Sequence, residues 1–326
     1  MRVNCAHYRI PIPADVSSPF PADSHRSAPI DLARVRALFA QPARIAESAF
    51  LRREIAARMH ERLALVRIAP ECVLDAGCGE GADGPALQKR FPDAMLLGLD
   101  ASPGMLLAAG RHQGAAQSAV RRLLQPWLAA GPGWDAGARL LCGNFSQLPL
   151  AAEAVDVVWS NLALHWHPQP DQVFPEWRRV LRTDGLLMFS CFGPDTFKEV
   201  RAAFLQADAM PHALPFVDMH DFGDMLVNAG FSTPVMDMEV LTVTYASVDK
   251  LMADMRAWGG NPLDTRRRGL LGRHAWQRVR QALERNRRPD GTLPLTFEVV
   301  YGHAFRPAPR RTVDGEAIVR FSPPRK

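Results

Sequence analysis

A glycine-rich turn is the segment whose residue types and spacing are best suited to binding a ligand. Asp75 ends a short apolar run, and Gly77, Gly79 and Gly81 follow at alternate positions. Glycine tolerates positive φ angles and lets a ligand approach the backbone closely. A second apolar run ends at Asp100, whose carboxylate can take ribose hydroxyls or can stand at the start of a helix. By itself the turn fits a dinucleotide or a nucleoside equally well.

Three features favour a nucleoside that carries a cationic amino-acid end. A carboxylate at Asp75 attracts a cation, whereas it gains nothing from the pyrophosphate of a dinucleotide. Residues 143–149 resemble the adenine-binding loop of class I methyltransferases that use S-adenosylmethionine (SAM), with Asn144 in place of the usual Asp. Residues 179–185 resemble the helix-to-strand connection of that class. The resemblance implies SAM as methyl donor and contacts from Asp75, Gly77, Cys78, Gly79, Gly81, Asp100, Ala101, Met105, Asn144, Phe145, Asn161 and Leu164.

The sequence predicts no metal site. His165 and His167 lie two residues apart, but no cysteine or carboxylate accompanies them at the spacing of a ligand set. His165 and Trp166 follow the carboxyl end of a predicted strand, where open α/β sheets bind their ligands. With Phe192 and Tyr301 they are candidates for positioning the methyl acceptor, and no residue is assigned a certain catalytic role.

The elements that must position these residues are short apolar runs separated by helical patterns. The runs are residues 72–76, 95–100, 139–144, 155–160 and 186–192. Such strands are typical of a parallel sheet covered by helices on both faces. Residues 241–245 and 295–301 alternate apolar and polar side chains, which suits edge or antiparallel strands. We therefore expect an α/β, Rossmann-like class I methyltransferase fold, with a mostly parallel seven-stranded sheet, an antiparallel edge strand and a helical lid.

The chain is expected to contain one domain with an extension at each end. Prolines interrupt residues 1–38 without periodicity, so we expect a flexible N-terminal extension there. The methyltransferase domain is expected over 39–305, with an insertion at 111–137 that is rich in Gly, Ala and Gln. The remaining expectations are lid or substrate segments at 194–222 and 247–290, and a C-terminal tail at 306–326.

Composition limits the environment of the chain. Of 326 residues 47% are hydrophobic, but no apolar run reaches the roughly 20 residues that cross a bilayer, so no membrane span is expected. The five cysteines form no Cys-x-x-Cys pair, and no apolar signal core precedes Pro11, which favours a cytoplasmic protein. A formal net charge of +5 permits an anionic partner without requiring one.

Three more segments extend the resemblance to one family. Residues 161–166, 192–199 and 293–304 closely resemble the malonyl-[acyl-carrier protein] O-methyltransferases of biotin synthesis. The similarity runs from about Phe50 to His303. A related branch, the mitochondrial complex I assembly factor that hydroxylates an arginine, resembles the cofactor half but is less similar over the last strand.

The resemblance implies methylation of the free carboxylate of malonyl-acyl carrier protein, in synthesis of the pimeloyl precursor of biotin. A carboxylate is already ionised at pH 7, so the displacement requires no general base. The alternatives are hydroxylation of an arginine on a partner protein and a non-enzymatic assembly role.

A basic cluster is the candidate docking surface for an acidic carrier protein. Its members are Arg266, Arg267, Arg268 and Arg273. A solvated helix face is the alternative interpretation of this cluster. Nucleic acid is not expected as a partner, because Trp276 is the one stacking aromatic residue among these arginines and those that follow up to Arg288.

Overall fold

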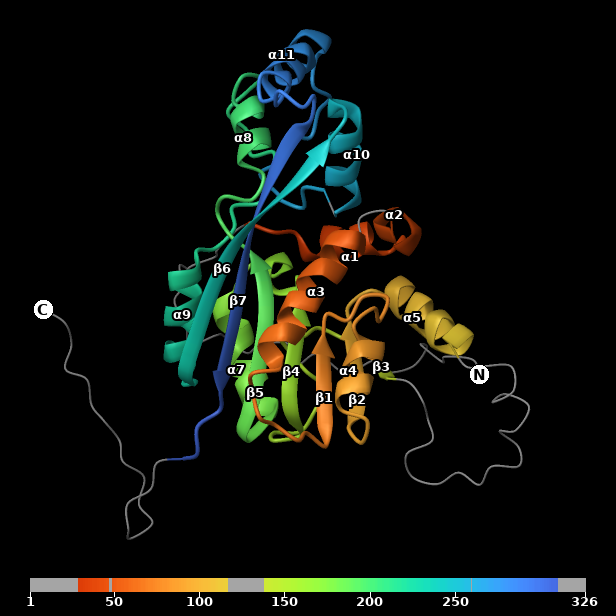
Figure 1. Ribbon diagram of the computed structural model, residues 1–326, viewed down its shortest axis with the longest axis vertical. Helices are drawn as coiled ribbons and strands as arrows, with labels where there is room; N and C mark the ends of the chain where they lie inside the picture. Colours follow the sequence, from red (N-terminus) through yellow and green to blue (C-terminus); the bar gives the residue numbers. More distant parts are fainter. Residues whose placement is uncertain (1–28, 47–48, 117–137, 259, 310–326) are drawn as a thin grey trace, which may run out of the picture.

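The computed structural model describes residues 29–46, 49–116, 138–258 and 260–309, which form a sheet with helices on both faces (Figure 1). The strands are β1 (Cys72–Ala76), β2 (Met95–Asp100), β3 (Arg139–Cys142), β4 (Val155–Asn161), β5 (Leu181–Phe192), β6 (Ser232–Tyr245) and β7 (Leu293–Phe305). Their order is β3-β2-β1-β4-β5-β7-β6. Strands β1 to β5 are parallel, and β7 is antiparallel to both β5 and the edge strand β6. The predicted fold class is therefore confirmed.

Helices follow most strands and cover the sheet. They are α1 (Leu32–Phe39), α2 (Pro42–Ala46), α3 (Ala49–Leu63), α4 (Gly84–Arg90), α5 (Pro103–Ala116), the 3-10 helix η1 (Leu164–Trp166), α7 (Pro170–Val180), α8 (Lys198–Phe204), α9 (Met219–Asn228), α10 (Val248–Ala257) and α11 (Arg273–Glu284). In β1, Val73 packs in the apolar layer that contains α3, whereas Leu74 packs in the layer that contains α7 and α9. This two-sided burial explains why the parallel strands are continuously apolar.

Three helices lie above the carboxyl ends of the parallel strands, beside one end each of β6 and β7 (Figure 1). We call α8, α10 and α11 the upper helices. The Arg278 guanidinium on α11 donates to the carbonyl of Gln206 beyond α8 at 2.8 Å, and Arg280 pairs with Asp249 of α10 at 2.5 Å. Helix α11 thus connects α8 to α10. The segments expected to form a lid, 194–222 and 247–290, contain these three helices and the start of α9.

The N-terminal boundary differs from the prediction. Residues 32–39 form helix α1, and the Asp31 carboxylate accepts from the backbone N–H groups of Ala33 and Arg34, as an N-cap does. The Asp31 N–H also donates to the carbonyl of Pro262 at 3.1 Å. Residues 29–38 are therefore part of the fold, and a flexible extension to residue 38 is wrong for them. This contact with Pro262, more than 200 residues away along the chain, fixes the position of α1.

Parts of the expected insertion, N-terminal extension and C-terminal tail lie outside the residues that the structure describes. Residues 111–116 of the expected insertion continue helix α5, and 117–137 lie outside the described residues. The same holds for 1–28 of the expected extension and for 310–326 of the expected tail.

Candidate active site

The glycine-rich turn lies between β1 and α4 and is hydrogen-bonded to the end of β2. The N–H groups of Gly77 and Cys78 donate to the Leu99 carbonyl at 2.8 and 3.0 Å, and the Gly79 N–H donates to the Asp100 carboxylate at 2.9 Å. Gly77 has a φ of 84°, and a Cβ there would lie 2.3 Å from the Cβ of Ala163. Both the backbone angle and the available space therefore require glycine at position 77.

A cavity opens beside this turn at the carboxyl ends of β1, β2 and β4; we call it the cofactor cavity. Its walls include nine of the residues expected to contact SAM: Asp75, Gly77, Cys78, Gly79, Asp100, Ala101, Met105, Phe145 and Asn161. These residues come from separate loops that the parallel sheet brings to one edge. Open α/β sheets bind their ligands in this position.

Three aspartates with raised pKa values line the cofactor cavity, and its Glu80 is paired with Arg52 at 3.5 Å. Burial, followed by the nearby charges of Asp83 and Asp100, raises the pKa of Asp75 well above its usual value. Burial also raises the pKa values of Asp83 and Asp100. Buried carboxylates that repel one another favour a cationic ligand. SAM carries a sulfonium and an ammonium group, so this set of acidic side chains fits SAM better than it fits a pyrophosphate.

Asp100 lies in the cavity wall, and two backbone N–H groups fix its carboxylate. One carboxylate oxygen accepts from the N–H of Gly79 at 2.9 Å and the other from the N–H of Ser102 at 2.7 Å. Each oxygen keeps a further lone pair for a hydroxyl donor. These backbone bonds orient the carboxylate toward the cavity that Ala101 and Met105 also line.

Asp83 is a cavity residue that the sequence analysis missed. Its carboxylate accepts from Trp159 Nε1 at 2.8 Å and from the Asn161 amide at 3.1 Å. The Asn161 amide oxygen in turn accepts from the Ser190 hydroxyl at 2.9 Å. Asn161 therefore orients Asp83 rather than offering a free amide. The available signal was a carboxylate just after the glycine turn, at the start of α4.

Helix α1 supplies a second set of missed residues: Val35, Arg36 and Phe39 line the cofactor cavity. The Phe39 ring packs edge-on against Trp166 at a centroid distance of 5.2 Å. The Asp31 N-cap followed by apolar residues was the sequence signal for this helix.

Three residues expected to contact SAM do not line the cofactor cavity. Gly81 has a φ of 74° and faces α5, where a Cβ would lie 3.2 Å from that of Ala109. The side-chain oxygen of Asn144 accepts from the N–H of Ser146 at 3.0 Å within its own turn. Leu164 is fully buried in the apolar layer beneath η1. Gly81 and Leu164 pack behind the cavity wall, against α5 and in the apolar layer. Of residues 143–149, Phe145 alone lines the cavity.

A second cavity adjoins the first, and Trp166 lines both. We call it the aromatic cavity, because rings form most of its wall. It brings together the expected positioning residues His165, Trp166 and Phe192 with residues of the upper helices. The His165 ring lies 5.0 Å from each of the other two rings. Burial lowers the pKa of His165 to about 3, so its imidazole is neutral at physiological pH.

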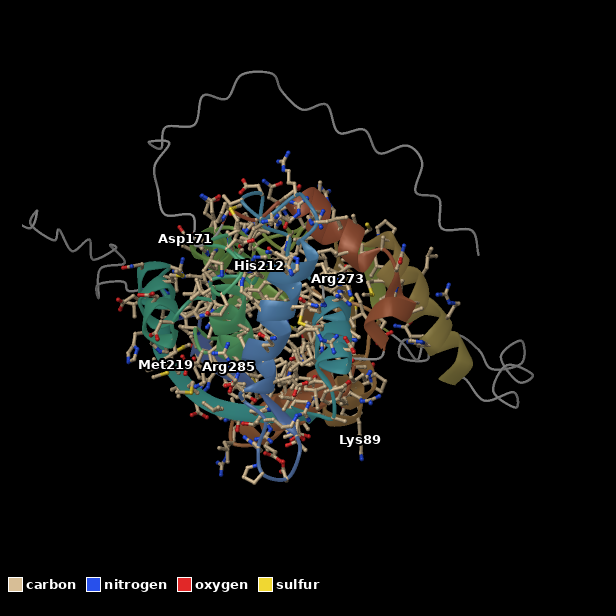
Figure 2. The ribbon with its side chains drawn as sticks, turned by 90° about the horizontal axis from the view of Figure 1, so that it is seen from above. Lys89, Asp171, His212, Met219, Arg273 and Arg285 are labelled. Carbon is tan, nitrogen blue, oxygen red and sulfur yellow. The ribbon has the colours of Figure 1, made fainter. Side chains whose placement is uncertain are left out.

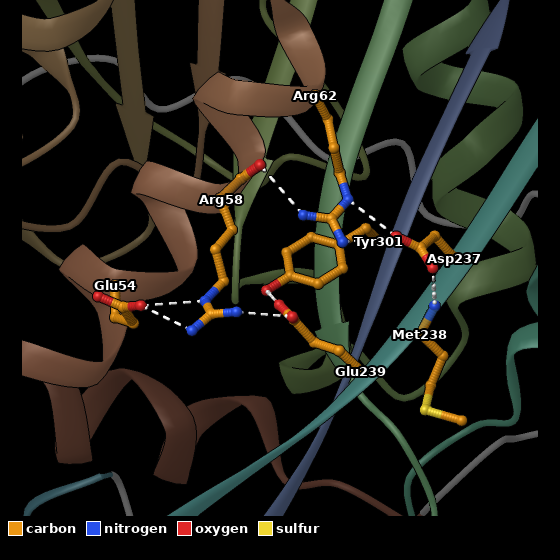
Figure 3. A network of polar contacts seen from close by, with 7 residues as sticks. All are labelled: Glu54, Arg58, Arg62, Asp237, Met238, Glu239 and Tyr301. Carbon is orange, nitrogen blue, oxygen red and sulfur yellow. Dashed lines mark hydrogen bonds and ion pairs between the residues drawn. The ribbon is translucent and has the colours of Figure 1, made fainter.

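Tyr301 is not part of either cavity, which corrects the fourth expected positioning residue. Its hydroxyl donates to Glu239 at 2.5 Å, and the Arg62 guanidinium lies 3.9 Å from the centre of its ring (Figure 3). Arg58 of α3 completes this network with a 2.7 Å ion pair to Glu239. The register of β7 against β6 turns Tyr301 toward α3 and away from the sheet edge that binds ligands.

The basic cluster divides into two pairs. Arg266 donates to the Leu263 carbonyl at 2.9 Å, and Arg267 pairs with Asp208 at 2.9 Å, so both hold the loop before α11 in place. Arg268 and Arg273 are exposed. Figure 2 shows Arg273 at one end of α11 and Arg285 toward the other.

The described residues contain neither a metal-binding cluster nor a helix that could cross a membrane. Among them no group of three or more His, Cys, Asp or Glu side chains lies close enough to hold a metal ion. None of the helices in the described ranges is long and apolar enough to cross a bilayer.

Comparison with known proteins agrees with this geometry. A family model described as a methyltransferase domain matches residues 74–189. A solved structure from Bacillus halodurans C-125 superposes with a TM-score of 0.51 at 17% identity, covering 78% of this chain and 99% of that one. The sheet order, the glycine turn and the cofactor cavity define a class I SAM-dependent methyltransferase.

Curated relatives specify the family. A malonyl-[acyl-carrier protein] O-methyltransferase from Laribacter hongkongensis is 49% identical over 298 residues, which is 90% of this chain and 96% of that protein. One of the same name from Gallionella capsiferriformans is 45% identical over 84% of this chain and 90% of its own length. The chain belongs to the malonyl-[acyl-carrier protein] O-methyltransferase family.

Proposed function

We propose that this enzyme methylates the free carboxylate of a malonyl group carried by acyl carrier protein, in biotin-precursor synthesis in the cytoplasm. The observation that carries the proposal is the joining of the cofactor cavity to the aromatic cavity at Trp166. One cavity suits a cationic methyl donor, and the other offers a mostly apolar path for a thin acyl chain. The names of the relatives identify the acyl group as malonyl on acyl carrier protein.

The reaction requires the protein to position the acceptor carboxylate, and it requires no proton transfer. When bound, SAM supplies a methyl group on sulfur; its transfer to a carboxylate oxygen forms a C–O bond, breaks the C–S bond and leaves the electron pair on sulfur. The acceptor has no proton to lose at pH 7, so no general base is needed. Trp166, Phe192 and Phe197 can exclude water and fix the approach of the acceptor, which is how positioning lowers such a barrier.

The outer face of the upper helices is the proposed docking surface for the acidic carrier. Arg268, Arg273 and Arg285 are exposed on or beside α11. A chain of rings connects this face to the aromatic cavity: Trp276 of α11 lies 6.5 Å from Phe204, which stacks on His212 at 4.0 Å. Phe204 and His212 both line the aromatic cavity. A carrier bound at α11 would therefore present its acyl arm close to the cavity.

The alternative functions have less support. Hydroxylation of an arginine and a non-enzymatic assembly role both remain compatible with a SAM-binding fold. The curated relatives reported above carry the name of the carboxyl methyltransferase.

Intact-protein mass spectrometry tests the proposal. Malonyl-acyl carrier protein is incubated with the enzyme and SAM, with unloaded and acetyl-loaded carrier as controls. A gain of one methylene on the malonyl form alone is the expected result. Retained SAM binding without any gain would contradict the proposed acceptor.

A further inference from the structure

Two buried ring nitrogens in the wall of the aromatic cavity lack a hydrogen bond. They are His165 Nδ1 on η1 and Trp258 Nε1 just after α10, and neither has a partner among the described residues. The two side chains are 9% and 8% exposed, and both line the cavity. A buried donor without a partner costs about 1–3 kcal/mol, so each such group calls for a physical explanation.

The other polar side chains of this wall are already paired or lie at its rim. His212 Nε2 contacts Asp208 at 2.8 Å. The Asn261 amide donates to the Pro211 carbonyl at 2.8 Å and its oxygen accepts from the Leu263 N–H at 3.0 Å. Arg256, in the last turn of α10, is exposed. His165, in its Nδ1–H tautomer, and Trp258 are thus the interior donors of this wall that have no partner among the described residues.

Both rings are held in place by their neighbours. The Trp258 indole stacks on Phe197 at a centroid distance of 5.8 Å and meets Phe297 edge-on at 4.6 Å. The His165 ring lies against Trp166, Phe192 and Phe216. Fixed donors lose little conformational freedom when a ligand binds.

Resting on the function proposed above, we propose that the neutral N–H groups of His165 and Trp258 hold the acceptor carboxylate by hydrogen bonds in the aromatic cavity. Both side chains line the aromatic cavity, and Trp166 lines this cavity and the cofactor cavity alike. The two donors therefore act as catalytic residues that touch the substrate, one from η1 and the other from the end of α10.

Neutral donors suit a carboxylate that must act as a nucleophile. A guanidinium would bind it through two charged hydrogen bonds and stabilise the ground state strongly. An indole N–H bears no formal charge, and an imidazole whose pKa burial lowers to about 3 bears none either at pH 7. They orient the oxygen while leaving its negative charge available. Exposed Arg256 at the rim can attract the malonyl group without remaining its final partner.

The test compares donor-free and donor-retaining variants in steady-state kinetics with malonyl-acyl carrier protein. Trp258→Phe and His165→Phe keep an aromatic ring but remove the N–H, and we expect each to lower kcat/KM about 10- to 100-fold. His165→Gln restores a neutral donor and should recover most of the loss. His303→Phe, outside the cavity walls, is the matched control variant and should retain the wild-type rate.

Acetyl-acyl carrier protein distinguishes hydrogen bonding from cavity shape, because it lacks the carboxylate. Its inhibition constant should be the same in wild type, Trp258→Phe and His165→Phe, and SAM affinity should also be unchanged. Equal losses of acetyl and malonyl binding would overturn the assignment and leave a packing role. Unchanged malonyl turnover in both variants would overturn it as well. Failure of the wild-type enzyme to methylate malonyl-acyl carrier protein, with SAM bound, would instead refute the proposed function and this assignment with it.

Discussion

The indole of Trp166 packs edge-on against the ring of Phe39, with the centroids 5.2 Å apart and the planes at 79°. Trp166 is the residue shared by the two cavities, and Phe39 ends helix α1 in the wall of the cofactor cavity. The Arg34 guanidinium on α1 also donates to the Asn261 carbonyl at 3.2 Å, beside the aromatic cavity. Helix α1 thus contacts both binding regions, and its position affects both.

We expect Phe39→Ala to weaken SAM binding about two- to tenfold, because an aromatic pair contributes roughly 0.5–1.5 kcal/mol beyond the area it buries. The methylation rate should fall as well, since Trp166 loses its support. Titration calorimetry measures the first effect and turnover the second. Val227→Ala removes an exposed apolar side chain on α9 and is the control. Equal affinities for Phe39→Ala and wild type would show that α1 is not part of the SAM site.

Asp75 is expected to make SAM binding depend on pH. Burial and the charges of Asp83 and Asp100 raise its pKa in the folded protein without ligand, and a bound cation would lower it. Binding should therefore release protons, so SAM affinity should rise with pH as Asp75 loses its proton. Calorimetry in buffers of different ionisation enthalpy measures that release. Binding heats that do not depend on the buffer would contradict it.

The same carboxylate is expected to destabilise the protein without ligand at high pH. Its folded-state pKa lies above the unfolded value of about 3.9, so the unfolding free energy falls as pH rises through this range. Asp75→Asn removes the charge and should raise the melting temperature at pH 8, while weakening SAM binding more than tenfold. Asp93→Asn, at an exposed position, is the control and should change neither quantity. A lower melting temperature for Asp75→Asn at pH 8 would count against the electrostatic account.

Reversal of charge at the start of α11 and in the loop before it tests carrier docking. Arg268→Glu with Arg273→Glu should raise KM for malonyl-acyl carrier protein about three- to tenfold at low salt, because exposed charges contribute little singly but steer association together. Methylation of a small malonyl thioester should stay unchanged. Arg67→Glu, an exposed charge before β1 at the opposite end of the strands, is the matched control. The same rise in KM for carrier-bound and small substrates would remove the docking surface.

Tyr301→Phe separates packing from catalysis. The variant loses the hydrogen bond to Glu239, so we expect a loss of about 1 kcal/mol in the free energy of unfolding. Because Tyr301 lines neither cavity, kcat/KM should remain within about twofold of wild type. Phe192→Ala, in the aromatic cavity wall, should lose activity as well as stability, because its ring is also buried in the apolar core. Denaturant unfolding and steady-state kinetics measure the two quantities, and a large kinetic loss in Tyr301→Phe would restore it as a positioning residue.

Local pattern was enough to identify the cofactor half of the molecule. A strand, a glycine turn and a helix are set by backbone sterics and by periodicity over about ten residues. Asp75 lies one residue before the end of β1 and Asp100 ends β2, so their meeting at the edge of a parallel sheet follows from the fold class. Asn144 was expected to contact SAM but does not line the cofactor cavity. The reason is local, because its side chain accepts a hydrogen bond within its own turn.

Only the tertiary structure decided the acceptor side and the N-terminal boundary. The face on which Tyr301 lies depends on the register of β7 against β6, and a shift of one residue would have reversed it. Helix α1 is fixed by the backbone bond from Asp31 to Pro262, which no short window of sequence reveals. His165 and Trp258 lie more than 90 positions apart and line one cavity because η1 and the upper helices pack over the same sheet edge. Long-range packing, rather than local propensity, determines contacts of this kind.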